Sequence, residues 1–284
     1  MTTDIAASPA QGKSTTNAGN TRWRKTAAEA AAPALGGVIF LMTWEALVTH
    51  FQVSRFILPP PSAIIVKMVN EFPSLVSALG FTASITVCAF IAALVSGVTL
   101  GVLLTQNKQV ERILWPYAVA LQVTPMVAIA PLVVIWVGLN RVWLGLMILA
   151  WIVAFFPMLS NTAVGMKSAD HGLRNVFSLY KATRWQRFRY LQLPSALPFI
   201  LAGARISSGL SVIGAVVAEF VAGAGNATGL AWTIVESGAM LDVARMFAAL
   251  FMLSAFGLTI WFIMAKVQHL LLSRWHESEL VQEG

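Results

Sequence analysis

The residues that most often perform catalytic or metal chemistry are few in this sequence, and they lie far apart. The four histidines, His50, His171, His269 and His276, fall near the ends of apolar segments, and Cys88 lies within one. There is no His-Glu-x-x-His motif and no Gly-x-Ser-x-Gly elbow to present a serine nucleophile. We therefore expect no catalytic residue, no bound metal and no bound cofactor, and interpret Cys88 as a small core side chain.

Ionisable side chains inside apolar runs form a second group of interest, because a charge in a bilayer costs a few kcal/mol or more. Glu45, Arg205 and Glu219 are the three candidates. Arg205 is expected to snorkel to the membrane surface or to pair between helices, and Glu45, beside Trp44, is expected at an interface or paired. Two roles stay open for Glu219, which either lines the outer mouth of a pathway or pairs with another helix.

Uncharged polar residues in the same apolar runs are better candidates for lining a solute pathway. Gly203, Ser207 and Ser211 also share the small-xxx-small spacing of closely packed membrane helices, as do Gly97 and Gly101, so helix packing is the alternative. The candidate pathway residues are Gln122, Thr124, Ser160, Asn161, Ser207, Ser208, Ser211 and Glu219.

The composition restricts the elements that can position these residues. Of 284 residues, 57% are hydrophobic and only 11% are charged, against about 25% charged in a soluble domain. The mean hydropathy of +0.74 favours an integral membrane protein and argues against a disordered chain, a coiled coil or a soluble enzyme. The net charge of +7 then predicts basic inner loops rather than a nucleic-acid site, because no soluble domain carries a basic stripe.

Six apolar runs are long enough to span a bilayer, which takes about 20 residues. A polar tail (1–29), expected to be largely disordered, precedes this membrane domain (30–275), and a short tail (276–284) follows it. The third run contains Pro116, Pro125 and Pro131, which predict a kink or a broken helix. The six runs are Ala30–Val48, Thr82–Leu104, Ile113–Leu139, Val142–Val164, Phe199–Val221 and Met246–Leu272.

The distribution of lysine and arginine predicts the orientation. With the N-terminus inside, the inner segments carry fourteen of these residues and the outer segments four. Cytoplasmic loops are enriched in lysine and arginine. Both termini are therefore expected in the cytoplasm.

The inner loop at 165–197 is longer than a connection between two helices needs to be. Leu173, Val176, Phe177 and Tyr180 have the spacing of one helical face, capped by Ser168 or Asp170. A second short helix is predicted to begin at Thr183, to display Trp185, Phe188 and Leu191, and to end at Pro194. Two interpretations stay open: a helix lying on the anionic inner leaflet, or a knob that enters a cleft of a cytosolic partner.

The segment from Asn175 to Pro194 resembles the EAA loop of ABC importer permeases. Trp185, Phe188 and the Leu193-Pro194 pair match its pattern. Asn175-Val176-Phe177 replaces Glu-Ala-Ala, and Lys181 stands where the family usually has glycine. This second departure puts the turn between the two short helices in question, because lysine resists a positive φ.

The likeness extends over roughly residues 55–275 and is closest to the nitrate, taurine and sulfonate branch. Leu58-Pro-Pro-Pro-Ser62, Thr124-Pro125, Trp136-Val-Gly138 and Ala218-Glu219 carry it. The resemblance implies an all-α, MetI-like ABC importer permease with six transmembrane helices in a bacterial inner membrane. The docking residues that it implies are Leu173, Val176, Phe177, Leu179, Tyr180, Lys181, Ala182, Trp185, Phe188 and Pro194.

The resemblance also implies partners: a second copy of the permease or a close homologue, two ATPase subunits that bind the ATP, and an extracytoplasmic solute-binding protein. The implied solute is a nitrate-, sulfonate- or taurine-like anion, or a small heterocyclic precursor such as a thiamine pyrimidine. Nucleic acid is not an expected partner. A secondary transporter and, less plausibly, an intramembrane enzyme are the alternative functions.

Overall fold

The computed structural model describes residues 35–222 and 228–273, and every regular element within these ranges is a helix. The predicted tails at 1–29 and 276–284 lie outside the described residues. The chain divides into two units, Met1–Ser62 and Ala63–Gly284. In the first unit the helix Leu35–His50 carries Glu45, whose carboxylate accepts bonds from the backbone N–H of Ser62 (3.0 Å) and from its hydroxyl (2.7 Å).

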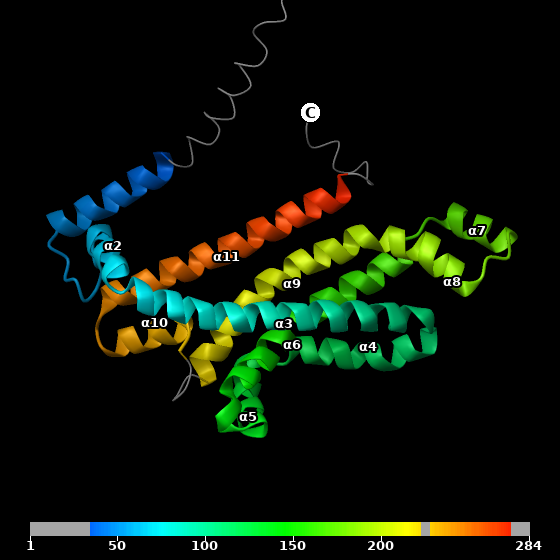
Figure 1. The fold of residues 1–284 in the computed structure, drawn as a ribbon, viewed down its shortest axis with the longest axis horizontal. Coiled ribbons are helices and arrows are strands. Elements are labelled where there is room, and N and C mark those ends of the chain that lie inside the picture. The colour runs from blue at the N-terminus through cyan, green and yellow to red at the C-terminus, as the bar shows by residue number, and fades with distance from the viewer. Residues whose placement is uncertain (1–34, 223–227, 274–284) are drawn as a thin grey trace, which may run out of the picture. The chain divides into compact units, whose positions relative to one another are not determined.

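Three long helices form the core of the second unit (Figure 1). They are α3 (Phe72–Gln106), α6 (Val142–Lys167) and α9 (Leu193–Ala222), and α6 packs against both of the others. The buried core includes Ile85, Leu146 and Leu149. Cys88 was expected in the core, but this prediction is wrong, because its side chain is exposed on the surface of α3. Each helix is apolar over most of its length, because a helix buried in protein on one side and in lipid on the other needs little polar surface.

Small residues let α3 and α6 approach closely. A Cβ added to Gly97 would lie 2.7 Å from the Cβ of Met158, and one added to Gly101 would lie 2.7 Å from the Cβ of Thr162. Such distances are well inside van der Waals contact, so neither position has room for a larger side chain. The small-xxx-small spacing at Gly97 and Gly101 therefore allows close helix packing, which was the predicted alternative to lining a pathway.

The apolar run at 113–139 is broken, as its prolines predicted. It forms α4 (Lys108–Val123) and α5 (Met126–Val137), which meet at an angle of 100°. The break falls at Thr124-Pro125, where Thr124 is extended with ψ 125°, the conformation that a following proline favours. Pro116 and Pro131 lie inside their helices without ending them.

The remaining elements lie at the two ends of the core (Figure 1). At one end are α2 (Pro61–Asn70), α10 (Leu230–Ala239) and the start of α11 (Val243–Leu272). At the other end are α7 (His171–Leu179) and α8 (Arg184–Arg187). A short 3-10 helix, Leu139–Arg141, joins α5 to α6.

Of the six predicted spans, four or five are found within the described residues. Within the described ranges, four helical runs are long and apolar enough to cross a membrane: α3, α6, α11 and the continuous run Arg184–Val221. The bent pair α4 and α5 adds a fifth if it counts as one span. The first predicted span begins outside the described residues, and the helix Leu35–His50 is too short to cross alone.

Candidate coupling and pathway sites

The loop helix α7 has a well-defined start. Asp170 is its N-cap, and the carboxylate accepts a hydrogen bond from the backbone N–H of Leu173 (3.1 Å). Of the two predicted caps, Asp170 takes this role, while the Ser168 hydroxyl donates to the Gly165 carbonyl at the end of α6 (2.8 Å). A side-chain cap satisfies an N–H that the first turn leaves free, so α7 can form without packing on a partner.

The turn at the end of α7 forms even though Lys181 replaces the usual glycine. Its φ is +50°, so lysine adopts the left-handed conformation that glycine usually provides. The Ala182 N–H donates to the Phe177 carbonyl (2.9 Å) and the Lys181 N–H to that of Ser178 (3.1 Å), which is the Schellman pattern. The turn is therefore kept without glycine, at a conformational cost of about 1–2 kcal/mol.

The second loop helix begins at Thr183, as predicted. Its hydroxyl accepts a bond from the Gln186 N–H (3.2 Å), and the Gln186 side chain accepts one from the Thr183 N–H (2.8 Å). This capping box fixes the start of α8 by local contacts. The rings of Trp185 and Phe188 pack with their centroids 5.5 Å apart.

The predicted end of this helix at Pro194 is wrong. A π-helical turn, Phe188–Gln192, follows α8 and leads directly into α9. The Leu193 N–H donates to the Phe188 carbonyl, five residues back. Because the hydrogen bonds shift register just before Pro194, its missing N–H falls in the first turn of α9, where a proline is tolerated.

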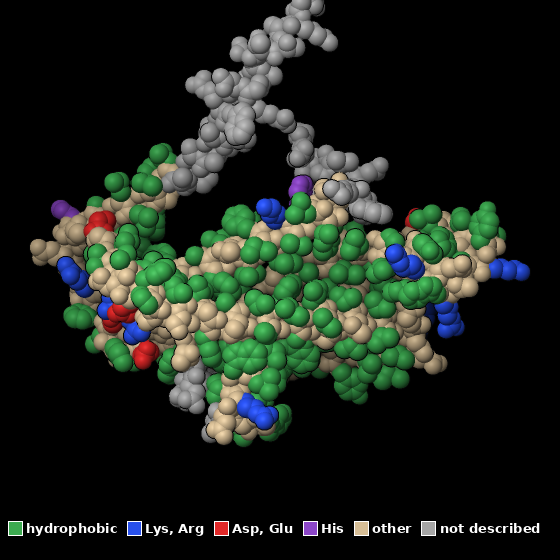
Figure 2. Space-filling view, viewed as in Figure 1, with side chains coloured by type: hydrophobic (Ala, Val, Ile, Leu, Met, Phe, Trp, Pro, Cys, Tyr) green, Lys and Arg blue, Asp and Glu red, His purple; other side chains and the backbone are tan. Residues whose placement is uncertain are grey.

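The loop helices expose their apolar side chains. Leu179 is 81% exposed, Tyr180 84% and Trp185 68%. A groove of about 330 Å³ lies between α7 and the π turn, which we call the docking groove; it is lined by Val176, Phe177, Tyr180, Ala182, Gln186 and Tyr190. Figure 2 shows hydrophobic and basic side chains intermingled at this end of the second unit.

Four of the ten predicted docking residues line this groove. Leu173, Leu179, Lys181, Trp185 and Phe188 lie on the loop outside it, and Pro194 lies in α9. Tyr190 was missed, because the predicted stripe followed a regular helical period and the π turn changes that period.

Most of the predicted pathway residues donate hydrogen bonds to backbone carbonyls of their own helix or of a neighbouring helix. The hydroxyl of Ser207, fully buried, donates to the Ala154 carbonyl of α6 (2.8 Å). Ser208 and Ser211 are also buried and donate to carbonyls within α9. In α6, the Asn161 amide donates to the Pro157 carbonyl (2.8 Å), and the Ser160 hydroxyl donates to the same carbonyl (3.3 Å).

Two pathway candidates differ from these because they are exposed. Gln122 and Thr124 lie at the end of α4, just before the bend into α5. The Thr124 hydroxyl donates to the Ala120 carbonyl (2.7 Å).

Glu219 is fully buried and holds the start of α10. One carboxylate oxygen accepts the Thr82 hydroxyl (2.7 Å), and the other accepts the Ala231 N–H (3.0 Å). The Thr82 hydroxyl in turn accepts the Leu230 N–H (2.9 Å). Gly229 is required here, because a Cβ at this position would lie 2.2 Å from Glu219 Oε2.

These contacts match the helix-pairing alternative for Glu219. A carboxylate at a helix N-terminus interacts favourably with the free N–H groups and with the helix dipole. Arg205 is paired as well, since its guanidinium lies 4.7 Å from the centre of the Trp261 ring on α11, a cation–π distance. Glu219 and Arg205 therefore each have a specific partner within the described residues.

The end of the second unit opposite α7 and α8 carries a group of ion pairs that sequence reasoning did not identify. Lys67 contacts Glu71 (2.8 Å) and Asp242 (2.7 Å), and Arg245 contacts Glu71 (2.8 Å) and Glu236 (3.7 Å). We call these five residues the charge cluster.

The charge cluster shifts the pKa of two of its members. Hydrogen bonds to Asp242 and Glu71 raise the pKa of Lys67. Partial burial acts to raise the pKa of Asp242, but the bonds from Lys67 and from the Arg245 N–H outweigh it and lower that pKa below its ordinary value.

The geometry defines a class of protein: a helical membrane subunit whose loop presents a self-capped apolar surface to the solvent. Residues 97–275 match the family described as binding-protein-dependent transport system inner membrane component. The chain belongs to this family, whose members are transport permeases rather than enzymes. The predicted ABC importer permease is thereby confirmed, and nothing found supports a secondary transporter.

Relatives with assigned names span most of the chain. It is 30% identical over 256 residues to the formylaminopyrimidine transport permease ThiX of Halalkalibacterium halodurans, covering 90% of this chain and 100% of the relative. It is 34% identical to the riboflavin permease RibX of Chloroflexus aurantiacus over 87% of this chain and 92% of that one. The taurine permease TauC of Escherichia coli is 27% identical over 78% of this chain and 81% of its own length.

Solved structures support the fold. An inward-facing MetNI methionine ABC transporter superimposes with a TM-score of 0.59 at 20% identity, covering 70% of this chain and 97% of the other. An amino acid ABC transporter superimposes with the same TM-score of 0.59 at 16% identity, covering 74% and 97%. The all-α permease fold is thus confirmed.

Proposed function

We propose that the loop 168–194 transmits the movement of an ABC ATPase to the membrane helices, with the docking groove as the contact surface. One observation carries this proposal: α7 and α8 are folded by their own caps, yet they leave Tyr180 84% exposed. Exposed aromatic side chains next to a groove are typical of the buried centre of a protein interface.

The complete importer in this proposal contains a second copy of the chain or a close homologue, two ATPase subunits and a solute-binding protein. Both chain termini and the loop lie in the cytoplasm, supported by the excess of lysine and arginine on the inner segments. ATP binding by the ATPases draws the two loops together, and the helices alternate between inward- and outward-facing states. The loop contributes the contact that differs between the two states.

The solute passes along surfaces that face a second subunit. Gln122 and Thr124 are supported as lining residues by their exposure at the α4–α5 bend, and Ser160 and Asn161 by their partial exposure on α6. Ser207, Ser208, Ser211 and Glu219 are buried, which supports a role in holding the helices that form the pathway.

The proposed solute is a small heterocycle of the vitamin-precursor class. Two relatives at 30% and 34% identity, each aligned over most of its length, are named for formylaminopyrimidine and riboflavin transport. The relatives named for nitrate are aligned over only 54% of this chain. Uptake measurements in cells that express the whole transporter test this. Uptake of a radiolabelled aminopyrimidine supports the proposal, whereas uptake of radiolabelled nitrate or taurine without uptake of the aminopyrimidine contradicts it.

Site-directed cross-linking tests the docking role. In a Cys88→Ser background, Tyr180→Cys should form a cross-link to the co-expressed ATPase subunit, because Tyr180 lines the docking groove. Asn175→Cys is the matched control, since Asn175 is also exposed on α7 but lies outside the groove. Equal cross-linking at both positions, or cross-linking at neither, would contradict the assigned surface.

A further inference from the structure

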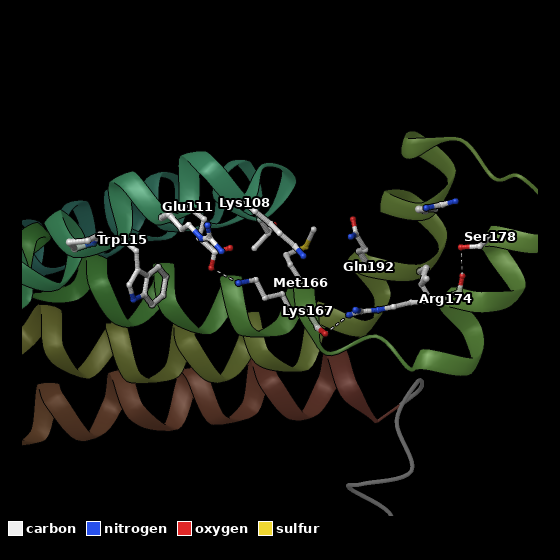
Figure 3. Close-up of a pocket in the computed structure, with 13 residues that line it drawn as sticks. Lys108, Glu111, Trp115, Met166, Lys167, Arg174, Ser178 and Gln192 are labelled. Carbon is white, nitrogen blue, oxygen red and sulfur yellow. Dashed lines mark hydrogen bonds and ion pairs between the residues drawn. The ribbon is translucent and has the colours of Figure 1, made fainter.

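A second hollow at the loop end of the molecule differs from the docking groove in both position and charge. This basic pocket has a volume of about 860 Å³ and lies between the start of α4, the end of α6 and the loop helices (Figure 3). No residue lines both hollows. Its charged lining residues are Lys108, Glu111, Arg112, Lys167, Arg174 and Arg187.

The pocket holds five cations and a single carboxylate. Glu111 pairs with Lys167, and the Arg174 guanidinium donates to the Lys167 backbone carbonyl. Lys108, Arg112 and Arg187 form no ion pair with any residue in the ranges 35–222 and 228–273. A concave surface with three unpaired cations concentrates a positive potential and attracts an anion.

The geometry of the cations favours a phosphate group. Arginine presents several N–H donors in a planar fork that matches phosphate oxygens, and Arg112, Arg174 and Arg187 approach the pocket from three different elements. Lys108 is the first residue of α4, so the positive end of that helix dipole adds to the potential.

The uncharged part of the lining indicates what carries the phosphate. Trp115, Pro116, Met166 and Leu191 form an apolar wall beside the cations. Beyond the pocket, α4 exposes Ile113 by 64% and Tyr117 by 71%, a surface suited to hydrocarbon chains. A free inorganic anion needs no such wall, whereas a phospholipid places a charged head group directly above acyl chains.

We propose that the basic pocket binds the phosphate head group of an anionic phospholipid at this end of the membrane helices. Basic pockets between membrane helices are typical sites for such head groups. Two of the cations, Arg174 and Arg187, belong to the loop, while Lys108, Arg112 and Lys167 belong to α4 and α6. A bound lipid therefore ties the loop to the spans, and its effect on coupling rests on the proposed function.

Native mass spectrometry of the purified full-length chain tests the site without an ATPase or a binding protein. Phosphatidylglycerol and phosphatidylcholine with the same acyl chains are titrated separately. We expect phosphatidylglycerol to bind more tightly, and the double variant Arg112→Gln/Arg187→Gln to weaken it roughly 30-fold, since each basic residue at an anionic surface contributes about fivefold.

The control variant is Arg184→Gln/Arg189→Gln, which removes the same number of charges at two loop residues outside the pocket. It should change phosphatidylglycerol binding less than twofold. An equal loss in both double variants, or equal binding of the two lipids by the natural chain, overturns the proposal. A third arm of the experiment adds inorganic phosphate. If millimolar phosphate leaves phosphatidylglycerol bound, the result supports a lipid site. If the chain binds phosphate tightly in the absence of lipid, the lipid proposal is overturned.

The same titration separates this inference from the proposed function. Lipid binding is measured on the chain alone, so a failed docking cross-link at Tyr180 leaves its result unchanged. Adding the ATPase subunit tests a different occupant: if phosphatidylglycerol stays bound to the natural chain when the ATPase is bound, the pocket and the groove are separate sites, as proposed. Displacement of the lipid by the bound ATPase would assign the pocket to the ATPase and contradict the lipid site.

Discussion

The two ends of the second unit, at α7–α8 and at α10 (Figure 1), differ in which side chains they expose and which they bury. At the α7–α8 end, apolar side chains such as Leu179 and Tyr180 are more than four-fifths exposed on helices that cap themselves. At the α10 end, the carboxylate of Glu219 is fully buried, and its oxygens accept hydrogen bonds from two other elements.

This contrast distinguishes the groups that stabilise the fold of the chain from those that are available to contact a partner. A buried carboxylate that accepts hydrogen bonds from its own chain is out of reach of another molecule, so its role is to fix the architecture. Apolar side chains exposed to water are unfavourable, so the free energy of an apolar groove falls when another surface covers it. Substitutions at the buried carboxylate should therefore change stability, whereas substitutions in the exposed groove should change function alone.

The largest effect is expected at the buried end. Glu219→Ala removes the acceptor of the Thr82 hydroxyl and of the Ala231 N–H, and leaving such buried groups unpaired should lower the free energy of unfolding by about 3 kcal/mol. Gly229→Ala should act in the same direction, because its Cβ would meet the same carboxylate at 2.2 Å. Thermal unfolding of the full-length chain in detergent measures both.

Glu236→Ala provides the control for this prediction. Glu236 is also a glutamate at the α10 end, but its side chain is 38% exposed and its carboxylate lies 3.7 Å from the Arg245 guanidinium. Exposed pairs of this kind contribute about 0–1 kcal/mol. If Glu219→Ala were no more destabilising than Glu236→Ala, the assigned capping role would be wrong.

The next effect is expected at the exposed end and only in function. Tyr180→Asp places a charge in the docking groove and should abolish solute-stimulated ATPase activity, with ATPase binding at least about 30-fold weaker, since a central aromatic residue contributes about 2 kcal/mol or more. The unfolding temperature should not change, because Tyr180 is 84% exposed. The measurement uses the reconstituted complex.

Asn175→Asp is the charge-matched control on the same helix, since Asn175 is exposed outside the groove. It should retain stimulation. Unchanged stimulation in Tyr180→Asp, or equal losses in both variants, would remove the distinction between the two ends of the molecule.

A smaller effect, of opposite sign, is expected at the turn between the loop helices. Lys181→Gly relieves a left-handed φ of +50°, worth about 1–2 kcal/mol, against an entropy cost of about 0.5–1 kcal/mol for glycine. The loop should become more stable by about 1 kcal/mol, seen as slower amide exchange in α7. Lys181→Ala removes the charge but keeps the Cβ, so it should not slow exchange; slowing in both would assign the effect to charge.

The parts of this structure that the sequence predicts are those controlled by neighbouring residues. The caps Asp170 and Thr183 bond to groups three residues away, and the break at Pro125 follows from the geometry of proline. The π turn could not be predicted, because it depends on the loop helix and α9 forming one continuous run. This is why Tyr190 and the passage through Pro194 were missed.

The role of Glu219 also needed the folded structure. Its partner Thr82 lies 137 residues away in the sequence, and no local pattern links a glutamate in one span to a threonine in another. The need for glycine at position 229 has the same origin, since a Cβ there would fit only if the Glu219 carboxylate moved away from α10. The family resemblance identified Ala218-Glu219 as a motif, but the contacts explain what the carboxylate does.

The smallest effect on stability is expected at the charge cluster. Its paired side chains are partly exposed, so they lie between the buried Glu219 carboxylate and the exposed docking groove in their degree of burial. Asp242 has a lowered pKa, so its stabilisation is present above the ordinary carboxyl pKa and is lost as the pH falls through the lower value in the folded chain. Lys67 has a raised pKa, so its stabilisation is lost only as the pH rises above that of a free lysine. The cluster should therefore contribute steadily between about pH 5 and pH 9.

Asp242→Asn isolates this charge, because an asparagine can still cap α11 through the Arg245 N–H, which the Asp242 carboxylate now accepts at 3.2 Å. At pH 7 the variant should lose about 0.5 kcal/mol, as expected for a pair that is one-third exposed. The difference from the natural chain should shrink as unfolding is measured at pH values approaching 3. If the variant lost no stability at pH 7, the Asp242 side chain would act through its cap alone, and a loss that stayed constant as the pH fell would likewise contradict a role for its charge.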